Sequence, residues 1–367
     1  HALKRKFDLV EIHNRPSYVQ QIFSKKVDFK IVLIFHNNPL SLGGSKTLNE
    51  RKFLLNNCKK LIFVSNWVKE KFFEGFKKKN YQNCSVVYPS VTPINRIAKK
   101  KNIISFVGKL NRSKGFHIFG NAIIKILKKY DSWSAIIVGD EPREKYNFFH
   151  KNLIYKGWIS HKKTLQLYDE TSISVVPSFW EEPFGRTAME AASRGCATIV
   201  SKRGGLVETV ADTIFLSKLN VDELYKKIEY LIVNKKIREQ LQEKSCKNVL
   251  HKLDENTTKI DNYRKEILNN YNFSIKRKKK FKILHISNFG SRLSNRLYFI
   301  SIARKLSNGF IREGHDVVNL SDRDIIKFNR YVAGQSGVKQ LNNLFFESVQ
   351  NYNPDLVLFG HSDNIYL

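Results

Sequence analysis

Residues 173–191 read ISVVPSFWEEPFGRTAMEA, and this stretch decides the fold. Ile173–Val176 is a short apolar run, typical of a strand that is buried on both faces. A loop containing proline and glycine follows it, and Thr187–Ser193 has the small and apolar residues of a helix packed on a sheet. A strand, a loop and a helix in this order form one step of an α/β fold.

The same step recurs on both sides of this stretch. The apolar residues of Phe116–Tyr130 lie at helical spacing, and from 221 to 270 the pattern is helical throughout. Further strands are expected at 103–107, 135–138, 153–158 and 197–200, and a further helix at 164–169. The sequence therefore predicts a doubly wound parallel sheet with a Rossmann-like arrangement in residues 96–272.

Two partial domains of the same type are expected to flank this one. Residues 1–95 contain predicted strands at 31–35 and 61–64, a helix at 46–57, and the closing prolines Pro89 and Pro93. We expect this block to lack the opening strands of its domain. After a basic linker at 273–280, residues 281–367 begin a further Rossmann-like domain and stop before it is complete, with strands expected at 281–287, 317–320 and 355–359 and a helix at 296–313.

Composition excludes several classes of protein. The chain has 367 residues, of which 42% are hydrophobic and 26% charged, so it is neither disordered nor fibrous. No apolar run reaches the roughly 18 residues of a membrane-spanning helix, and we expect no secretory leader at the start. The first residue is His1 rather than Met, which suggests a fragment. The cysteines at 58, 84, 196 and 246 have no metal-binding spacing, which favours a reduced cytoplasmic location.

The net charge of +31 is the unusual quantity. Such a balance favours polyanionic partners: nucleic acid, an anionic membrane surface or anionic substrates. The basic residues are scattered along the chain rather than gathered on one helix face, so a compositional bias of the whole surface is the favoured interpretation. A peripheral contact with the inner face of an anionic membrane is compatible with this charge, and we expect no nucleic-acid partner.

Ligands of an open parallel sheet bind outside the carboxyl ends of its strands. After the strand at 103–107 comes Gly108-Lys109, and Lys114-Gly115 follows before the next helix. Small residues, cations and a helix N-terminus together suit a diphosphate. A solvated turn has the same composition, so this loop alone does not identify a site.

Two carboxylates stand in the stretch quoted first. Glu182 lies in the loop, together with Phe184, Gly185 and Arg186, and Glu190 lies one turn inside the following helix. Carboxylates accept hydrogen bonds from paired hydroxyls, as ribose and hexose present them. The apolar neighbours of Glu190 argue against two ordinary surface glutamates.

A third loop follows the strand at 197–200. Gly204 and Gly205 allow close approach of a ligand to the backbone, with amide donors facing it. Glu208, near the start of the next predicted helix, is either part of this site or a charge that complements the helix dipole.

The set Gly108-Lys109…Lys114-Gly115, Glu182-Pro183-Phe184-Gly185…Glu190 and Gly204-Gly205…Glu208 resembles the retaining GT-B glycosyltransferases of the glycogen-synthase and lipopolysaccharide-glucosyltransferase superfamily. The resemblance covers nearly all of residues 96–272. It extends more loosely over residues 1–95, through Phe35-His36-Asn37-Asn38-Pro39 and Phe63-Val64-Ser65. Residues 281–367 resemble more weakly the amino-terminal half of a second glycosyltransferase, of the spore-maturation CgeB type.

The resemblance implies a hexosyl transfer from a nucleoside-diphosphate sugar to the hydroxyl of a saccharide or lipid-linked acceptor, with retention and without cofactor or metal. It places the reaction in synthesis of cell-surface polysaccharide or lipopolysaccharide. Glu190 would bind the ribose and Glu182 the donor sugar. Lys109 and Lys114 would hold the diphosphate, although the family usually has arginine at the first of these positions.

The remaining implied roles concern the sugar end of the donor. Backbone amides of Gly185 and Arg186 would lie near the sugar, and His36 would face it from the acceptor side. His36 and Glu182 are the expected catalytic residues, and Phe184, Gly204 and Gly205 are expected to belong to the donor site. For His36 a loop-capping role is equally compatible with the sequence. Asp322-Arg323-Asp324 matches a metal-binding Asp-x-Asp by letter, but a surface turn is expected there.

Two alternatives remain open at this point. A nucleotide-sugar epimerase can use the same two-domain fold, and would turn over its donor without an acceptor. A basic nucleic-acid-binding protein is favoured only by the net charge, and a salt titration of DNA binding would decide it.

Overall fold

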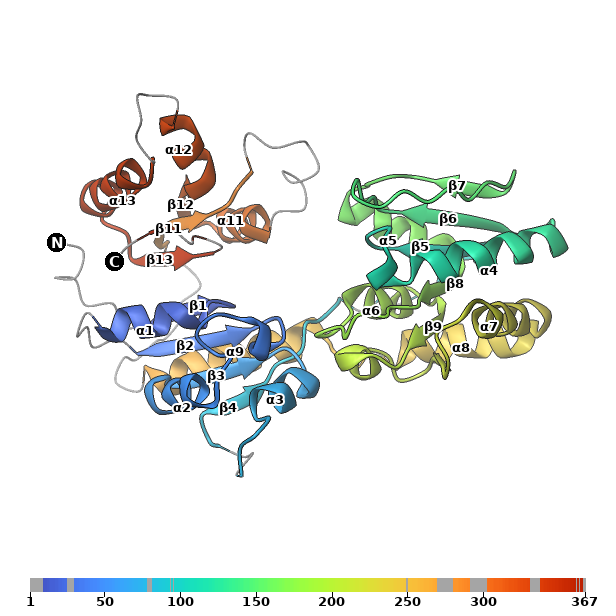
Figure 1. Ribbon diagram of the computed structural model, residues 1–367, viewed down its shortest axis with the longest axis horizontal. Coiled ribbons are helices and arrows are strands. Elements are labelled where there is room, and N and C mark those ends of the chain that lie inside the picture. The colour runs from blue at the N-terminus through green and yellow to red at the C-terminus, as the bar shows by residue number, and fades with distance from the viewer. Residues whose placement is uncertain are drawn as a thin grey trace. The chain divides into compact units, whose positions relative to one another are not determined.

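The computed structural model describes residues 9–24, 30–77, 81–92, 94, 96–248, 250–268, 280–290, 302–330, 337–360, 362 and 364–365. The chain forms two compact units (Figure 1). The first unit contains residues 1–63, 70–85 and 261–367, and the second contains residues 64–69 and 86–260. Each unit has its own parallel sheet or sheets, and each is described separately.

The second unit is built on a six-stranded sheet with the order β10-β9-β8-β5-β6-β7. Its strands pair in parallel. In chain order they are β5 (Lys101–Val107), β6 (Ser134–Val138), β7 (Leu153–Tyr155), β8 (Thr171–Val176), β9 (Ala197–Ser201) and β10 (Ile214–Leu216). The chain runs outward from β5 through β6 to β7 and then returns to β8 on the other side of β5. The topological switch point, where open α/β sheets bind ligands, therefore lies between β5 and β8.

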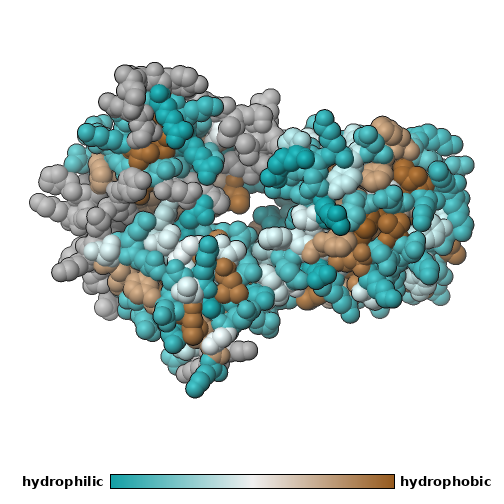
Figure 2. Space-filling view, in the orientation of Figure 1, coloured by the Kyte–Doolittle hydropathy of each residue, from teal (hydrophilic) through white to brown (hydrophobic). Residues whose placement is uncertain are grey.

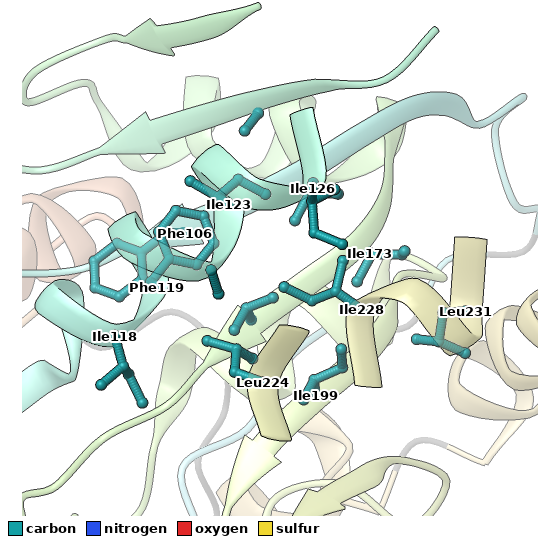
Figure 3. Packing of buried hydrophobic residues seen from close by; sticks show 14 of the residues in the cluster. Phe106, Ile118, Phe119, Ile123, Ile126, Ile173, Ile199, Leu224, Ile228 and Leu231 are labelled. Carbon is teal, nitrogen blue, oxygen red and sulfur yellow. The ribbon is translucent and has the colours of Figure 1, made fainter. Parts of the chain in front are cut away.

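Helices cover both faces of this sheet. They are α4 (Phe116–Lys129), α5 (His161–Glu170), α6 (Arg186–Ser193), α7 (Val221–Val233) and α8 (Lys235–Lys247), with the 3-10 helices η3 (Arg112–Lys114) and η4 (Gly204–Glu208). In Figure 3, Ile123 and Ile126 of α4 lie across from Leu224 and Ile228 of α7, with Ile173 of β8 beside them.

Burial of α4 follows from its apolar spacing. Phe119, Ile123, Ile126 and Leu127 are fully buried, and each such side chain contributes roughly 1.5–3 kcal/mol of hydrophobic free energy. Lys128 and Lys129 occupy the last turn, where positive charge complements the helix dipole. The helix therefore holds its own N-terminal turn, and the loop before it, in a fixed place at the end of β5.

The first unit contains a four-stranded sheet with the order β1-β2-β3-β4. Its strands are β1 (Val10–His13), β2 (Ile31–Phe35), β3 (Lys60–Phe63) and β4 (Cys84–Val86). The helices of this unit are α1 (Pro16–Ser24), η2 (Pro39–Ser41) and α2 (Leu48–Asn57). The helices α3 (Asn66–Phe72) and α9 (Leu253–Ile267) each begin in the second unit and end in the first. The residues of β2 and β3 are all buried, as the apolar sequence predicts for every one of them except Lys60.

A three-stranded parallel sheet with the order β12-β11-β13 also belongs to the first unit. It consists of β11 (Lys282–Ser287), β12 (Asp316–Ser321) and β13 (Leu356–Phe359), with α11 (Ile302–Arg312), α12 (Asp322–Asn329) and α13 (Val338–Tyr352). The predicted linker at 273–280 lies outside the described residues except for residue 280, and the predicted helix at 296–313 is described only from residue 302.

One local prediction in this sheet is wrong. Asp322 is fully buried and begins α12, so Asp322-Arg323-Asp324 is not a surface turn. An acidic residue in the first turn of a helix complements the positive end of its dipole, which explains the pattern without a metal.

The predicted fold class is confirmed: the chain is an α/β protein with parallel Rossmann-like sheets. Three short strands were not predicted, namely β1, β4 and β10. Among the helices of the described segments, none has both the length and the apolar character needed to cross a bilayer.

Candidate functional site

The loop between β5 and α4 is held by its own side chains. Asn111 Oδ1 accepts hydrogen bonds from the Lys114 amide at 3.0 Å and from the Ser113 hydroxyl at 2.9 Å. Gly115 has φ +74°, and a Cβ there would lie 1.9 Å from the carbonyl oxygen of Pro177. Only glycine fits this backbone, so the lysine-bearing loop packs directly against the loop that follows β8.

Gly108 and the two lysines of this loop differ in their surroundings. The Gly108 amide donates to the carbonyl of Val138 at 2.9 Å, at the ends of β5 and β6. Lys109 is exposed, whereas Lys114 is half-buried. The two cations predicted to hold a diphosphate therefore stand on one short loop at the switch point, one in solvent and one engaged with the protein.

Glu182 is the partner of Lys114. Its side chain is buried, and Oε1 accepts hydrogen bonds from the Ser178 hydroxyl and from Lys114 Nζ, both at 2.5 Å. The ends of β5 and β8 thus meet through a charged pair. Lys114 and Glu182 were predicted to bind separate parts of a ligand, and their contact with each other was not predicted.

Glu190 has a different set of partners. It lies on α6 and is only 6% exposed, and its Oε1 is 3.1 Å from both His161 Nε2 and Arg186 Nη2. Burial alone would raise the pKa of this carboxyl group. The hydrogen bond from His161 and the charge of Arg186 outweigh burial, so the pKa of Glu190 is lowered. The carboxylate is therefore kept ionised, which suits an acceptor of hydroxyl hydrogen bonds.

Gly204 and Gly205 contact the loop of Glu182 through the backbone. The Gly205 amide donates to the Glu182 carbonyl at 2.7 Å, and a Cβ on Gly205 would lie 2.4 Å from the carbonyl oxygen of Pro183. Gly204 has φ +57°, and a Cβ there would lie 2.3 Å from the Glu182 carbonyl oxygen. The paired glycines thus let two loops of the protein approach each other closely.

Phe184, Gly185 and Arg186 connect Glu182 to α6. Phe184 is buried and Arg186 exposed, and Gly185 precedes α6 with φ +108°. The backbone turns sharply between the two glutamates, which places Glu182 in the loop and Glu190 in the helix, as predicted from their spacing.

Glu208 caps a helix, but not the one predicted. Its two carboxylate oxygens accept hydrogen bonds from the backbone amides of Asn66 and Trp67, each at 2.8 Å, at the start of α3. Oε2 also accepts from the Tyr88 hydroxyl at 3.0 Å. The predicted interaction of Glu208 with the start of its own helix is wrong, because Glu208 ends η4. Its charge complements the N-terminus of a helix that is distant in sequence.

His36 belongs to the first unit, at the end of β2. Its Nε2 is 3.0 Å from His13 Nδ1, and the two rings stack with centroids 5.3 Å apart. The backbone amides of His36 and Asn37 donate to Asn14 Oδ1, each at 3.1 Å. The structure therefore gives His36 a histidine neighbour that the sequence did not suggest.

Within the second unit, the structure brings together Lys114 with Glu182, and Gly204 and Gly205 with the Glu182 loop. Sequence reasoning missed Ser178 as a partner of Glu182, His161 as a partner of Glu190, and Tyr88 as a partner of Glu208. Ser178 lies two residues after the end of β8, and His161 begins α5 after β7, so the rule of strand carboxyl ends could have found both. Across the described ranges, no cluster of three or more His, Cys, Asp or Glu side chains could hold a metal ion.

Part of the second unit is similar to a known protein family. Residues 90–248 match the model of the family described as "Glycosyl transferases group 1". This segment contains every predicted site residue except His36. The match shows similarity to this family over that segment.

Individual relatives are consistent with this match. The chain is 24% identical over 240 residues to spore coat protein SA of Bacillus subtilis, covering 57% of this chain and 63% of that protein. It is 24% identical over 267 residues to the lipopolysaccharide 1,2-N-acetylglucosaminetransferase of Salmonella typhimurium, covering 66% of this chain and 68% of that protein. The chain spans about three fifths of the length of several curated relatives that it matches.

Solved structures share the fold. Anabaena HepE, crystallised with UDP-glucose, superimposes with a TM-score of 0.57 at 17% identity, covering 71% of this chain and 79% of that one. The structural neighbours are GT-B glycosyltransferases, and the GT-B fold class predicted from the sequence is confirmed.

Proposed function

We propose that this chain is a glycosyltransferase that uses a nucleoside-diphosphate sugar as donor and transfers a hexose to a hydroxyl group with retention of configuration. The observation that supports it best is the charge arrangement at the switch point of the second unit. A buried, ionised Glu190 stands on α6, and Lys109 and Lys114 stand on the loop before α4. This segment lies within the match to group 1 glycosyltransferases.

Each proposed role follows from the chemistry of the residue. Glu190 accepts hydrogen bonds from the ribose hydroxyls, and Glu182 accepts them from hydroxyls of the donor sugar. Lys109 and Lys114 neutralise the diphosphate, whose charge grows as the glycosidic bond breaks. Gly108, Gly185 and Gly204 let the donor approach the backbone, with Phe184 and Arg186 in the same loop as Gly185. Gly205, predicted for the same role, instead donates its amide to the Glu182 carbonyl and holds the loop in place.

Several finer points belong to the same proposal. His36 faces the transferred sugar, no cofactor or metal takes part, and the product belongs to cell-surface polysaccharide or lipopolysaccharide. The acceptor is a saccharide or a lipid-linked saccharide, and the enzyme acts in the cytoplasm, at the inner face of an anionic membrane. Residues 281–367 begin a second, CgeB-like glycosyltransferase domain. The comparisons give no support to an epimerase or a nucleic-acid-binding protein.

The donor is the part of the proposal that can be tested first. A thermal-shift screen of nucleotide-sugars, beginning with UDP-glucose because HepE binds it, is expected to find a compound that stabilises the chain. Calorimetry then compares Glu190→Ala with Glu170→Ala, since Glu170 is a glutamate at the end of α5 that pairs with Lys101.

We expect Glu190→Ala to weaken donor binding by tenfold or more, as roughly 1.5–3 kcal/mol is typical for hydrogen bonds to a charged group. Glu170→Ala is expected to bind like the wild type. Equal donor affinity in Glu190→Ala and the wild type would contradict the proposed ribose site.

A further inference from the structure

An aromatic cluster lies behind the loop of Glu182, and the proposed donor contacts do not use it. The rings of Tyr88 and His251 stack with centroids 4.1 Å apart. Phe184 completes the cluster, 5.4 Å from the His251 ring and 5.9 Å from the Tyr88 ring. Phe184 is two residues from Glu182 and is only 3% exposed. The cluster therefore supports the Glu182 loop through Phe184, a side chain that belongs to that loop.

One residue anchors this cluster. The Tyr88 hydroxyl donates to Glu208 Oε2 at 3.0 Å, and His251 Nε2 lies 2.7 Å from the backbone carbonyl oxygen of Glu208. A carbonyl oxygen only accepts, so Nε2 of His251 carries the proton and donates it. Burial lowers the pKa of His251, which favours the neutral ring.

The backbone of the Glu182 loop is held by the 3-10 helix η4, which contains Glu208. Glu208 ends η4, and Gly205 of η4 donates to the Glu182 carbonyl, while the Ser65 hydroxyl donates to the Pro183 carbonyl at 2.5 Å. The backbone of the Glu182 loop is thus bonded directly to η4. Its Phe184 side chain is connected to η4 through the ring of His251.

His251 itself is fixed by its own backbone. Its carbonyl accepts from the Val91 amide at 3.1 Å, and the Leu253 amide donates to the Val91 carbonyl at 3.2 Å. The ring is 8% exposed. It lies beyond residue 248, where the family match ends, so the family match assigns it no role.

We propose that His251 is a positioning residue that acts through Phe184 to hold Glu182 at the donor sugar. The proposal rests on the proposed function, because it assumes that Glu182 binds the sugar. Holding a reacting group in place matters because a displacement of about 1 Å at a site can cost on the order of 10²-fold in rate. The ring contacts of His251 are with Tyr88 and Phe184 rather than with Glu190 or Lys109, so the nucleotide part of the donor is bound without it.

The test compares a ligand that has the sugar with one that lacks it. Calorimetry with UDP-glucose and with UDP is carried out on the wild-type chain and on His251→Ala. We expect UDP affinity to stay within about twofold, while the added affinity for UDP-glucose over UDP is lost. An equal loss for both ligands, or no loss for either, would overturn the proposal.

Two further variants separate the ring from its hydrogen bond. His251→Gln keeps a side-chain donor and loses the ring, whereas His251→Phe keeps a ring and loses the donor. Each is expected to fall between the wild type and His251→Ala, and they carry the test if His251→Ala does not fold. The buried control Ile228→Val, in the core of α7, is expected to leave the preference for UDP-glucose unchanged.

A double variant tests the route through Phe184. In a Phe184→Ala background, His251→Ala is expected to have little further effect on the preference, since the contact is already absent. Hydrogen exchange of the peptide covering 177–190 is expected to rise in His251→Ala, and that of α4 to stay the same. Additive effects of the two substitutions would show that His251 does not act through Phe184.

The failure of this inference differs from failure of the proposed function. Loss of donor binding in Glu190→Ala with an unchanged UDP-glucose preference in His251→Ala would reject the positioning role alone. Unchanged donor binding in Glu190→Ala would reject the proposed ribose site.

Discussion

Three of the charged residues proposed to bind the donor, Lys114, Glu182 and Glu190, are already paired with neighbours in the protein. Lys114 donates to Glu182, and Arg186 and His161 lie against Glu190. A phosphate or a hydroxyl that binds here exchanges one polar partner for another, so it need not desolvate a bare charge. This exchange lowers the free-energy cost of binding. The two lysines differ in their surroundings, because only Lys109 is exposed.

This inequality leads to the first prediction. Lys109→Ala and Lys114→Ala are each expected to weaken binding of UDP more than binding of uridine, by roughly 1.5–3 kcal/mol for a charge-assisted contact. Lys114→Ala should in addition lower thermal stability, because it leaves the buried Glu182 without its cation. Calorimetry with UDP and uridine, together with thermal unfolding, measures both effects. Equal losses for UDP and uridine would show that neither lysine contacts the diphosphate.

Glu190 gives a prediction about pH. Its pKa is lowered in the folded chain, so its charged form contributes stability that is present above the pKa of an unfolded glutamate and is lost as the pH falls through the folded value. Glu190→Gln is expected to be less stable than the wild type at pH 7, by about 1 kcal/mol after allowance for the exposure of Arg186.

The stability difference between Glu190→Gln and the wild type should shrink as the pH falls below the ordinary glutamate range. Denaturant unfolding at several pH values measures it. A difference that is constant with pH would show that Glu190 is not kept ionised by the fold.

The sequence predicted a site residue only where the side chain could bind a ligand and also followed the end of a predicted strand. Glu190 stood out because it was a carboxylate among alanines after a strand end. The contacts of Glu208 were not predicted, because its partners, Asn66 and Trp67, are about 140 residues away in the chain, and no local pattern encodes such a contact. His251 was missed for the same reason.

At the level of elements, the paired glycines are the connection between η4 and the loop of Glu182. A Cβ on Gly205 would lie 2.4 Å from the Pro183 carbonyl oxygen and 2.9 Å from Ser65 Oγ. Because the nearest atom belongs to the backbone, the loop itself must shift to admit it. Gly309 lies on the exposed side of α11, and a Cβ added there would meet no atom within 4 Å.

The two glycines form a matched pair for substitution. Gly205→Ala is expected to destabilise the chain and to reduce donor binding, because it displaces the Glu182 loop. Gly309→Ala is expected to stabilise the chain by about 0.5–1 kcal/mol, because alanine has a higher helix propensity. Thermal unfolding and UDP-glucose calorimetry compare them. Donor binding by Gly205→Ala that matches the wild type would show that the close approach of the two loops is dispensable.

Several elements with a clear apolar period were predicted within a few residues, but the helix α13 was missed although Leu341, Phe345 and Val349 are buried at helical spacing. The predicted strand at 31–35 is β2, and the predicted helix at 116–130 is α4. The strands that were missed are short, and the four residues of β1 alternate between the apolar Val10 and Ile12 and the polar Glu11 and His13. Such a strand is recognised only through its partner, here the parallel pairing of Val10–His13 with β2.

At the level of the whole molecule, the sequence predicts the order of domains along the chain, and the structure shows which segments pack together. The predicted blocks are contiguous, whereas the two compact units are assembled from separate segments: residues 64–69 belong to the second unit, and residues 261–367 to the first. Composition and turn signals mark where a chain changes character, but not which distant segments pack together. The positions of the domain boundaries at 95 and 272 remain predictions.

The net charge of +31 gives the last prediction. Hydrophilic side chains cover much of both units in Figure 2, and the basic residues are spread through the sequence rather than placed along one helix. Diffuse charge binds any polyanion weakly, and counterion release makes that binding fall by orders of magnitude between about 50 and 200 mM salt. A donor held by a few charged contacts inside a folded site should be less sensitive.

We therefore expect DNA binding, measured by fluorescence anisotropy, to be lost over this salt range, and UDP binding, measured by calorimetry, to change by only a few fold. Anionic vesicles are expected to behave like DNA, because a contact made by diffuse surface charge does not distinguish the two polyanions. DNA binding that persists at about 200 mM salt while UDP fails to bind would favour a nucleic-acid-binding protein. It would also show that the charge is functional rather than compositional.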